Sequence, residues 1–509
     1  MKIRHPANFI SQPDEKASAD ELNQVSFAFP GKFYKPLVII FFSLAAVVRL
    51  LLCWANPPGN SFDDHFTPIF MIIKSGMTPA KDACFQCYHP PVFYWISAMI
   101  GKLALNAGAS LPHMIKLLQF VCCFYGIMTV GICYLILEKF PFSNFSKLLG
   151  FGTVCFLPRH IYMCAMNSND TISYLFVAAS IYLAIIAWER GLSPWSLGAL
   201  SVVLWITIFT KYTSFVVIPA VLAPFILAFL KRLAFSQRKV LLSAMCVLFL
   251  PMFMLASYIF SNLKYYHSPL PWNLTMYDPS VNRPHDEGGI SFFTFKPWED
   301  VKTPMLAPGK LHSFWTLIYS GMWFDTEPYF QHYLDSNAAW WKHYYGWYRG
   351  EESFPGKNPS QSGQTILEES GLIGLGLFPL FLMLTGFYQC IKNFIFGGDL
   401  VRANPVARIN LGMFPVLALF NVAGIIALTL RLPVYNTMKP SYLLNAMPAF
   451  MIFLCLGIMF CERNATLKRA TLATFGMLFA IAIMHIVHIF FAIRSVQSQL
   501  AFCRHFLSG

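Results

Sequence analysis

Long apolar runs most constrain what this chain can fold into. A helix needs about 20 mostly apolar residues to cross the roughly 30 Å hydrocarbon core of a membrane. Eleven runs can span: 36–54, 114–136, 147–165, 171–188, 194–209, 213–230, 240–260, 368–389, 410–430, 442–461 and 471–493. The sequence therefore predicts an all-α polytopic membrane protein with about 11 transmembrane helices.

Composition supports this class of protein and argues against a nucleic-acid-binding one. Charged residues make up 12% of the 509 residues and hydrophobic residues 56%, whereas soluble domains carry about 25% charged residues. The net charge of +13 is compatible with a nucleic-acid partner, but Lys and Arg sit in short patches between the apolar runs. That pattern is typical of topology signals. We therefore expect a lipid bilayer and no nucleic acid as partner.

A twelfth apolar segment, 92–105, decides the predicted topology, and it is short for a spanning helix. Suppose that it lies on the surface and that the N-terminus is cytoplasmic. The basic cluster 231–239 then faces the cytoplasm, and the short outer loops carry only Lys211, Arg431 and Lys439, as the positive-inside rule requires. If the segment crossed, that cluster would face outward. We therefore expect 92–105 to be an interfacial helix.

This topology divides the chain into regions with different expected roles. They are a cytoplasmic tail 1–35, a transmembrane core 36–260 with a first outer loop 55–113, an outer segment 261–365 that is the expected acceptor region, C-terminal transmembrane helices 366–493 and an outer tail 494–509. The outer segment is rich in aromatic residues, including Trp315, Trp323, Trp340, Trp341 and Trp347. These side chains favour an interfacial belt over an acceptor groove.

Two adjacent carboxylates, Asp63 and Asp64, follow the first apolar run. Ionisable groups at a membrane are functional candidates by default. One carboxylate could accept a proton from a hydroxyl nucleophile while the other orients it or holds a metal ion. The structural alternative is that Asp63 caps a helix that begins near His65. The position at a membrane exit favours the catalytic interpretation.

Asp170 and Lys211 lie in two further outer turns. Asn169 or Asp170 could simply cap the next helix, or Asp170 could supply a second carboxylate to the same cavity. Lys211 is the only charge between Arg190 and Lys231. It could snorkel to the surface or bind an anionic phosphate.

Arg431 and Lys439 flank another outer turn, 431–442, which ends at Tyr442. Together with Lys211, these two cations could hold the phosphate of a lipid-linked donor.

The loop before segment 92–105 contains His89, Cys84 and Cys87. His89 alone is weak evidence for a site. The two cysteines and His89 give three zinc ligands at most, and in an oxidising outer compartment a local disulfide is an equal alternative.

Taken together, these residues resemble the GT-C superfamily of membrane glycosyltransferases, which use polyprenyl-phosphate sugar donors. Within it, the chain is similar to the protein O-mannosyltransferases and the lipid A aminoarabinose transferase. The order of the motifs carries the resemblance: Phe62-Asp63-Asp64, two juxtamembrane helices at about 65–76 and 91–105, His89-Pro90-Pro91-Val92-Phe93-Tyr94-Trp95, Asp170, Thr210-Lys211, and Lys439-Pro440-Ser441-Tyr442-Leu443-Leu444 with Pro448. Asp64 departs from a frequent glutamate, and Ser441 from a frequent arginine.

The resemblance implies a GT-C fold with outer juxtamembrane helices and one long outer loop. It implies transfer of one sugar, with inversion, from an undecaprenyl or dolichyl phosphate to a hydroxyl or amine of a lipid, glycan or protein acceptor at the outer face. The implied site consists of catalytic Asp63, Asp64 and Asp170, donor-phosphate-binding Lys211, Arg431 and Lys439, and substrate-binding His89 and Tyr442.

The resemblance leaves three questions open. Some members of the superfamily use a divalent metal ion, but the sequence shows no strong ligand set for one. The membrane is either a bacterial inner membrane, with a periplasmic site, or the endoplasmic reticulum, with a lumenal site. The rival functions are a transporter or flippase for a lipid-linked or anionic substrate, in which acids and cations also serve, and a non-catalytic scaffold. Transporters often contain repeats, and none is visible in the sequence.

Overall fold

The computed structural model describes most of the chain and leaves out part of the predicted site. The described residues are 31–59, 65–271, 293–298, 313–325, 329–330, 333–334, 343, 363–397, 405–431 and 438–507. Asp63 and Asp64 lie outside them, as does most of the outer segment 261–365. Within these ranges the protein is helical and contains no strand.

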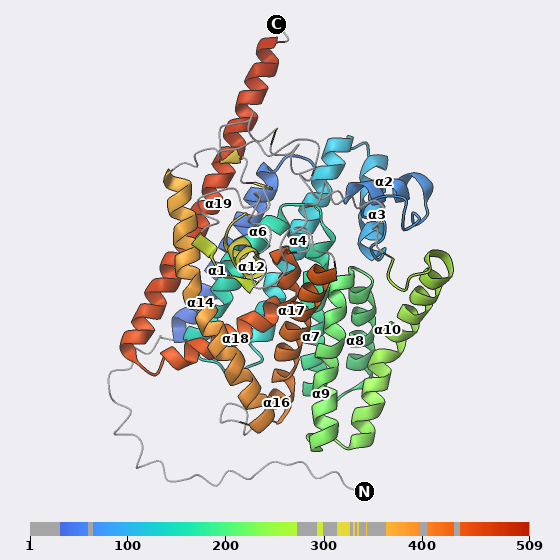
Figure 1. Ribbon diagram of the computed structural model, residues 1–509, viewed down its shortest axis with the longest axis vertical. Helices are drawn as coiled ribbons and strands as arrows, with labels where there is room; N and C mark the ends of the chain where they lie inside the picture. The colour runs from blue at the N-terminus through green and yellow to red at the C-terminus, as the bar shows by residue number, and fades with distance from the viewer. Residues whose placement is uncertain are drawn as a thin grey trace.

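Helices of the first half form the body of the fold (Figure 1). They are α1 (Gly31–Ala55), α2 (Phe66–Ser75), α3 (Val92–Asn106), α4 (Leu111–Leu137), α5 (Asn144–Phe156), α6 (Pro158–Cys164), α7 (Asn169–Glu189), α8 (Pro194–Ile208), the 3-10 turn η1 (Tyr212–Val216), α9 (Val217–Lys231) and α10 (Gln237–Tyr266). α7 packs on α4 and α8, and α10 packs on α8 and α9 at one side of the molecule.

Helices of the second half pack back onto this body. They are α12 (Phe314–Trp323), α14 (Gly363–Phe396), α16 (Pro405–Leu411), α17 (Met413–Arg431), the 3-10 turn η6 (Pro440–Ala446), α18 (Met447–Cys461) and α19 (Ala465–Leu507). α14 packs on both α18 and α19, and α19 also reaches α1 and α5. Of these helices, α14 and α19 lie on the side opposite to α10 (Figure 1), whereas α17 packs on α9.

Nine helices of the described chain are long and apolar enough to cross a membrane. The protein is therefore an integral, multi-pass membrane protein, as predicted. Two predicted runs fall short: run 147–165 is divided into α5 and α6, and run 194–209 forms the 15-residue α8. Both runs are helical but are not among the nine described helices that are long enough to span. The count of about 11 spans therefore stays a prediction.

Arg49 of α1 stabilises the break between α5 and α6. Pro158 has no N–H with which to continue α5, so the last carbonyls of α5 need other donors. The Arg49 guanidinium donates to the carbonyl oxygens of Val154 at 3.2 Å and Cys155 at 2.7 Å, and lies 2.8 Å from Nδ1 of His160. Broken helices persist at membrane depth only where the freed backbone groups are satisfied within the protein.

The two predicted juxtamembrane helices are present as α2 and α3. Both are too short to count as spans. They pack on each other and on α4 through an apolar cluster that includes Ile69, Phe93 and Leu118. The segment 92–105 is therefore a short helix beside the bundle, and its interfacial position stays a prediction.

One helix of the outer segment returns to the core. α12 packs through Phe314 and Leu317 on Leu443 of η6, while Trp323 on its other side packs on Leu372 of α14. Trp323 is buried and so does not belong to an interfacial belt. Trp340, Trp341 and Trp347 lie outside the described residues.

α14 and α18 approach each other closely where both carry glycine. A Cβ atom at Gly386 would collide with the backbone of Phe453, and one at Gly457 would collide with the backbone of Leu382. Small residues at such crossings let helix backbones touch, which is how helices associate in a membrane.

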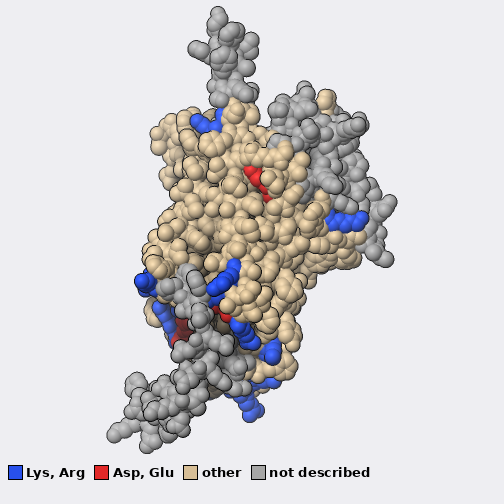
Figure 2. All heavy atoms as spheres, turned by 90° about the vertical axis from the view of Figure 1, so that its left-hand side faces the viewer, with Lys and Arg blue, Asp and Glu red and all other residues tan. Residues whose placement is uncertain are grey.

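The surface has the charge distribution of a membrane protein. Figure 2 shows a broad band with few charged side chains, with Lys and Arg gathered toward the lower end. α1 and α19 both begin at the lower end in Figure 1, and Lys32, Lys35, Arg463 and Arg469 beside those helix ends are exposed. These residues belong to the segments that the positive-inside rule assigns to the cytoplasm.

Candidate active site

Asp170 and Lys211 meet where α7 begins and α8 has ended. The ammonium Nζ of Lys211 lies 2.7 Å from Oδ1 of Asp170, and the two side chains are 5% and 4% exposed. Lys211 therefore does not snorkel to the surface: its side chain turns inward to a carboxylate. An ion pair this deeply buried depends on both partners, because either charge alone would be left without compensation.

Ser168, and not Asn169 or Asp170, caps α7. Its hydroxyl accepts a hydrogen bond from the backbone N–H of Asp170 at 3.3 Å and lies equally far from Oδ2 of that residue. Because Ser168 serves as the cap, the Asp170 carboxylate is available for Lys211. Neither Asn169 nor Asp170 is therefore the N-cap residue, and Asp170 lies in the first turn of α7.

Tyr442 of the late motif lies against the same ion pair. Nζ of Lys211 is 5.0 Å from the centre of the Tyr442 ring, which is within cation–π range. The turn η6 that carries Tyr442 is fixed from α7: Tyr174 donates to the carbonyl oxygen of Ser441 at 2.8 Å, and Ser173 donates to Asn445 at 2.8 Å. Three motifs that are far apart in the sequence thus meet at one place.

His89 approaches this place from the loop before α3. Its ring centre is 6.2 Å from that of Tyr212, the residue after Lys211, and Tyr212 donates to the carbonyl oxygen of Tyr88 at 3.0 Å. On its other side His89 stacks on His65 at 6.2 Å. His65 directly follows Asp64 in the sequence and lies 2.9 Å from the hydroxyl of Tyr94.

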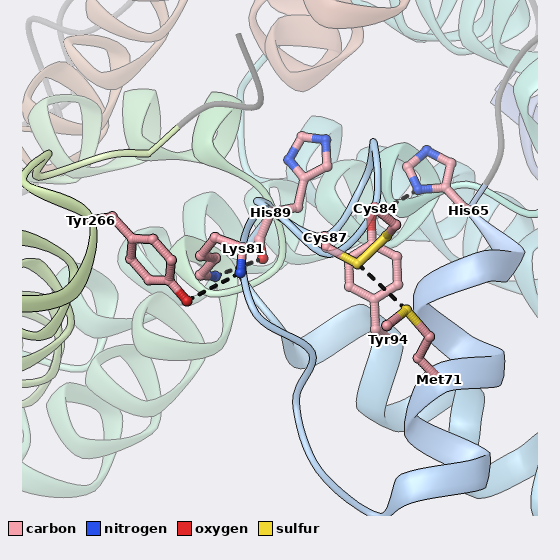
Figure 3. The surroundings of a disulfide bond; sticks show 8 residues. All are labelled: His65, Met71, Lys81, Cys84, Cys87, His89, Tyr94 and Tyr266. Atoms are coloured by element: carbon pink, nitrogen blue, oxygen red, sulfur yellow. Dashed lines mark hydrogen bonds between the residues drawn. A yellow bond between two sulfur atoms is a disulfide. The ribbon is translucent and has the colours of Figure 1, made fainter. Parts of the chain in front are cut away.

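Cys84 and Cys87 are bonded to each other in a disulfide. Figure 3 shows it beside Met71 of α2, below the rings of His65 and His89. The disulfide occupies both thiols, so they are not zinc ligands here. Among the described residues no group of three or more His, Cys, Asp or Glu side chains could hold a metal ion.

Lys439 lies just before Tyr442 in the sequence, but its neighbour differs from those of the Asp170–Lys211 pair. Its Nζ donates to the hydroxyl of Tyr329 at 3.2 Å. Arg159 of α6 lies over the same ring at 5.6 Å and is 4.0 Å from Oδ1 of Asp325. The structure thus brings Lys439 beside a second cation, Arg159. The side chain of Arg431 is outside the described part of the chain.

Several buried polar residues were missed at the sequence level. Arg49 and Arg159 lie inside predicted apolar runs, and Glu368, on the edge of another, is 2.9 Å from Nδ1 of His485 and 3.1 Å from Nδ1 of His488. A charge within an apolar run was the available signal, because such residues usually face the interior of a bundle.

These geometries define a polytopic, all-helical membrane protein with a buried polar site at one end. The profile of a family described as "Dolichyl-phosphate-mannose-protein mannosyltransferase" matches residues 88–258. That stretch contains His89, Asp170 and Lys211. The match confirms the resemblance to the GT-C superfamily. No curated protein sequence matches the chain significantly.

Solved structures of two kinds of protein resemble the chain. The oligosaccharyltransferase of Archaeoglobus fulgidus is 13% identical with a TM-score of 0.47, over 88% of this chain and 53% of that one. The structure of its complex with an inhibitory peptide and a dolichol-phosphate is 13% identical in sequence with a TM-score of 0.49, over 92% of this chain and 56% of that one. ArnT from Cupriavidus metallidurans is 16% identical with a TM-score of 0.36, over 83% and 77%. The chain spans about half of the archaeal enzyme's length.

Proposed function

We propose that the protein is a membrane glycosyltransferase. It would move one sugar from a polyprenyl phosphate, undecaprenyl or dolichyl, to an acceptor hydroxyl or amine at the outer face, with inversion at the anomeric carbon. The observation that supports this most is the meeting of three distant motifs: Lys211 contacts both Asp170 and Tyr442. A resemblance carried by isolated motifs would not require them to touch.

Asp63 is our candidate for the general base. It would take the proton from the acceptor as the acceptor oxygen or nitrogen bonds to the anomeric carbon, and the bond from that carbon to the phosphate oxygen would break. Asp64 and Asp170 would support or orient it. The lipid phosphate is already a good leaving group, so positioning and charge stabilisation would supply most of the rate.

Lys211, Arg431 and Lys439 are proposed to bind the donor phosphate. The ammonium of Lys211 carries three N–H donors, and its contact with Asp170 uses one of them. Lys211 could therefore bind a phosphate oxygen while keeping the ion pair. Lys439 would share this role at the start of η6, and His89 and Tyr442 would line the substrate site.

The disulfide supports an outer position for the site. Disulfides persist in the periplasm and the endoplasmic reticulum lumen but are rare in the cytosol. The Cys84–Cys87 bridge lies in the loop that carries His89. This agrees with a periplasmic or lumenal active site.

A transfer assay tests the proposal. Purified protein in detergent would be given a set of radiolabelled polyprenyl-phosphate sugars, with crude membrane as acceptor source. We expect transfer from one donor, and a loss of at least about 100-fold in Asp63→Asn, within the range for a lost acid–base group. Asp82→Asn is the matched control, because Asp82 is an exposed acid of the same outer loop.

Two outcomes would overturn the proposal. Full transfer by a well-folded Asp63→Asn protein would remove Asp63 as general base. No turnover of any donor, with the lipid bound equally by both proteins, would favour a transporter or flippase for a lipid-linked or anionic substrate.

A further inference from the structure

Lys81 is a buried lysine in the outer loop between α2 and α3. It is 7% exposed. Its Nζ donates to the carbonyl oxygen of His89 at 3.1 Å and to the hydroxyl of Tyr258 in α10 at 2.6 Å, and lies 4.8 Å from the centre of the Tyr258 ring. Its backbone N–H donates to the hydroxyl of Tyr266 at 3.1 Å, as Figure 3 shows. One residue thus joins the loop to α10 by both its backbone and its side chain.

The contacts of Lys81 continue to the candidate active site. The hydroxyl of Tyr258 also lies 3.0 Å from that of Tyr212, the residue after Lys211. Lys81 also donates to the carbonyl oxygen of His89, and the ring of His89 stacks on that of His65. Lys81 therefore lies between the element that carries Lys211 and the residue that follows the Asp63-Asp64 pair.

No carboxylate among the described residues forms an ion pair with Lys81. Burying a charge without an opposite charge costs free energy. Burial indeed lowers the pKa of Lys81 to about 8. A methionine or leucine would fill this space without that cost, so the ammonium is explained by what it binds and not by packing.

We propose that Lys81 is a positioning residue for the reaction: it holds the His89 turn against α10 and so fixes His89 and His65, the residue that directly follows Asp64 in the sequence. The Cys84–Cys87 disulfide restricts the same turn, because both cysteines lie between Lys81 and His89 in the sequence. The consequence for catalysis rests on the proposed glycosyl transfer. The anchoring of the turn does not.

The test compares Lys81→Met, Lys81→Arg and Tyr258→Phe in the full-length protein. Lys102→Met is the matched control, since Lys102 is an exposed lysine of α3. The first readout is hydrogen exchange at the backbone amides of residues 81–92. The second is the kinetics of sugar transfer, with kcat and the KM for the donor determined separately.

We expect faster exchange over residues 81–92 in Lys81→Met and Tyr258→Phe, with no change in Lys102→Met. kcat should fall about tenfold or more in Lys81→Met, because small misplacements of reacting groups cost up to about 100-fold. The KM for the donor should rise as well, because the displaced turn carries His89, which is proposed to line the substrate site. Lys81→Arg should restore most of kcat, since a guanidinium can donate to the same two oxygens. A variant that combines Lys81→Met with Tyr258→Phe should lose little more kcat than either single variant, because the two side chains share one contact.

Exchange and kcat that are both unchanged in Lys81→Met would overturn the inference. So would a rise in KM with unchanged kcat, because that would make Lys81 a binding residue. If Lys81→Met does not fold, Tyr258→Phe decides, since it removes a single oxygen atom. If the wild-type protein transfers no sugar, the proposed function fails, and hydrogen exchange alone decides whether Lys81 anchors the turn.

Discussion

Asp170 and Lys211 form a buried ion pair, with Oδ1 and Nζ 2.7 Å apart, between the start of α7 and the turn that follows α8. From the sequence alone, Asp170 could have been merely a helix cap and Lys211 a lysine that snorkels to the surface. Their contact, with Tyr442 against the lysine, makes one site out of three motifs. Its electrostatics give the first prediction.

Lys211→Met should lower the free energy of unfolding by about 3–5 kcal/mol, because it leaves the Asp170 carboxylate buried and unpaired. Asp170→Asn should do the same by leaving the lysine unpaired. The double variant should be more stable than either single one. Thermal unfolding in detergent measures this. The control is Lys139→Met, which removes a more exposed pair with Glu189, with side chains 27% and 35% exposed, and should cost less than about 1 kcal/mol. Equal effects at the two pairs would contradict the prediction.

Arg49→Met should lower the free energy of unfolding more than a core substitution that leaves every buried polar group with its partner. It leaves the carbonyl oxygens of Val154 and Cys155 without their donor, and a buried unsatisfied polar group costs about 1–3 kcal/mol. Arg49→Lys should recover part of this loss, because an ammonium can still donate to one of them. A melting temperature of Arg49→Met equal to that of the wild type would show that the break between α5 and α6 is stable without the guanidinium.

Stability should rise with pH through the titration of Lys81. The pKa of Lys81 is about 8 in the folded protein and 10.5 ordinarily. Between these values the unfolded chain binds one more proton than the folded one, so unfolding becomes less favourable as the pH rises. Below about pH 8 both states are protonated, and Lys81 contributes no slope. Melting temperatures from pH 7 to 10.5 should therefore rise less in Lys81→Met than in the wild type. Identical profiles would refute this assignment.

Gly386→Ala should separate α14 from α18. A Cβ atom there has no room beside the backbone of Phe453, and backbone cannot move aside as a flexible side chain can. Overpacking of this kind typically costs about 1–3 kcal/mol. Gly374→Ala in the same helix has nothing within 4 Å of the new Cβ and should be neutral or stabilising, because alanine favours a helix interior over glycine. Comparable losses in both variants would point to helix bending instead of the crossing.

Much of the helical architecture could be predicted because it depends on local composition. Each predicted apolar run is helical, and both juxtamembrane segments are helices. The break at Pro158 was missed although proline was visible there, because an apolar run is judged by its summed hydropathy. Whether the helix continues depends on a donor from elsewhere, which here is Arg49 of α1.

The candidate site was predictable as a set of residue types and not as a set of contacts. The sequence indicated Asp170, Lys211 and Tyr442 as members of one face. The sequence did not show that Lys211 forms an ion pair with Asp170. It also did not show that Lys439 lies against Tyr329 instead. It left the disulfide of Cys84 and Cys87 open against zinc, because the same spacing suits both.

The sequence by itself determined the membrane class, the helices and the order of the motifs, since the free energy of placing a segment in a bilayer is set by the residues of that segment. Tertiary structure alone decided which charge lies against which. Lys81 shows the reason: its partners are a carbonyl eight residues away and a hydroxyl 177 residues away. The environment of a buried charge depends on the packing of distant helices, and no local pattern encodes that packing.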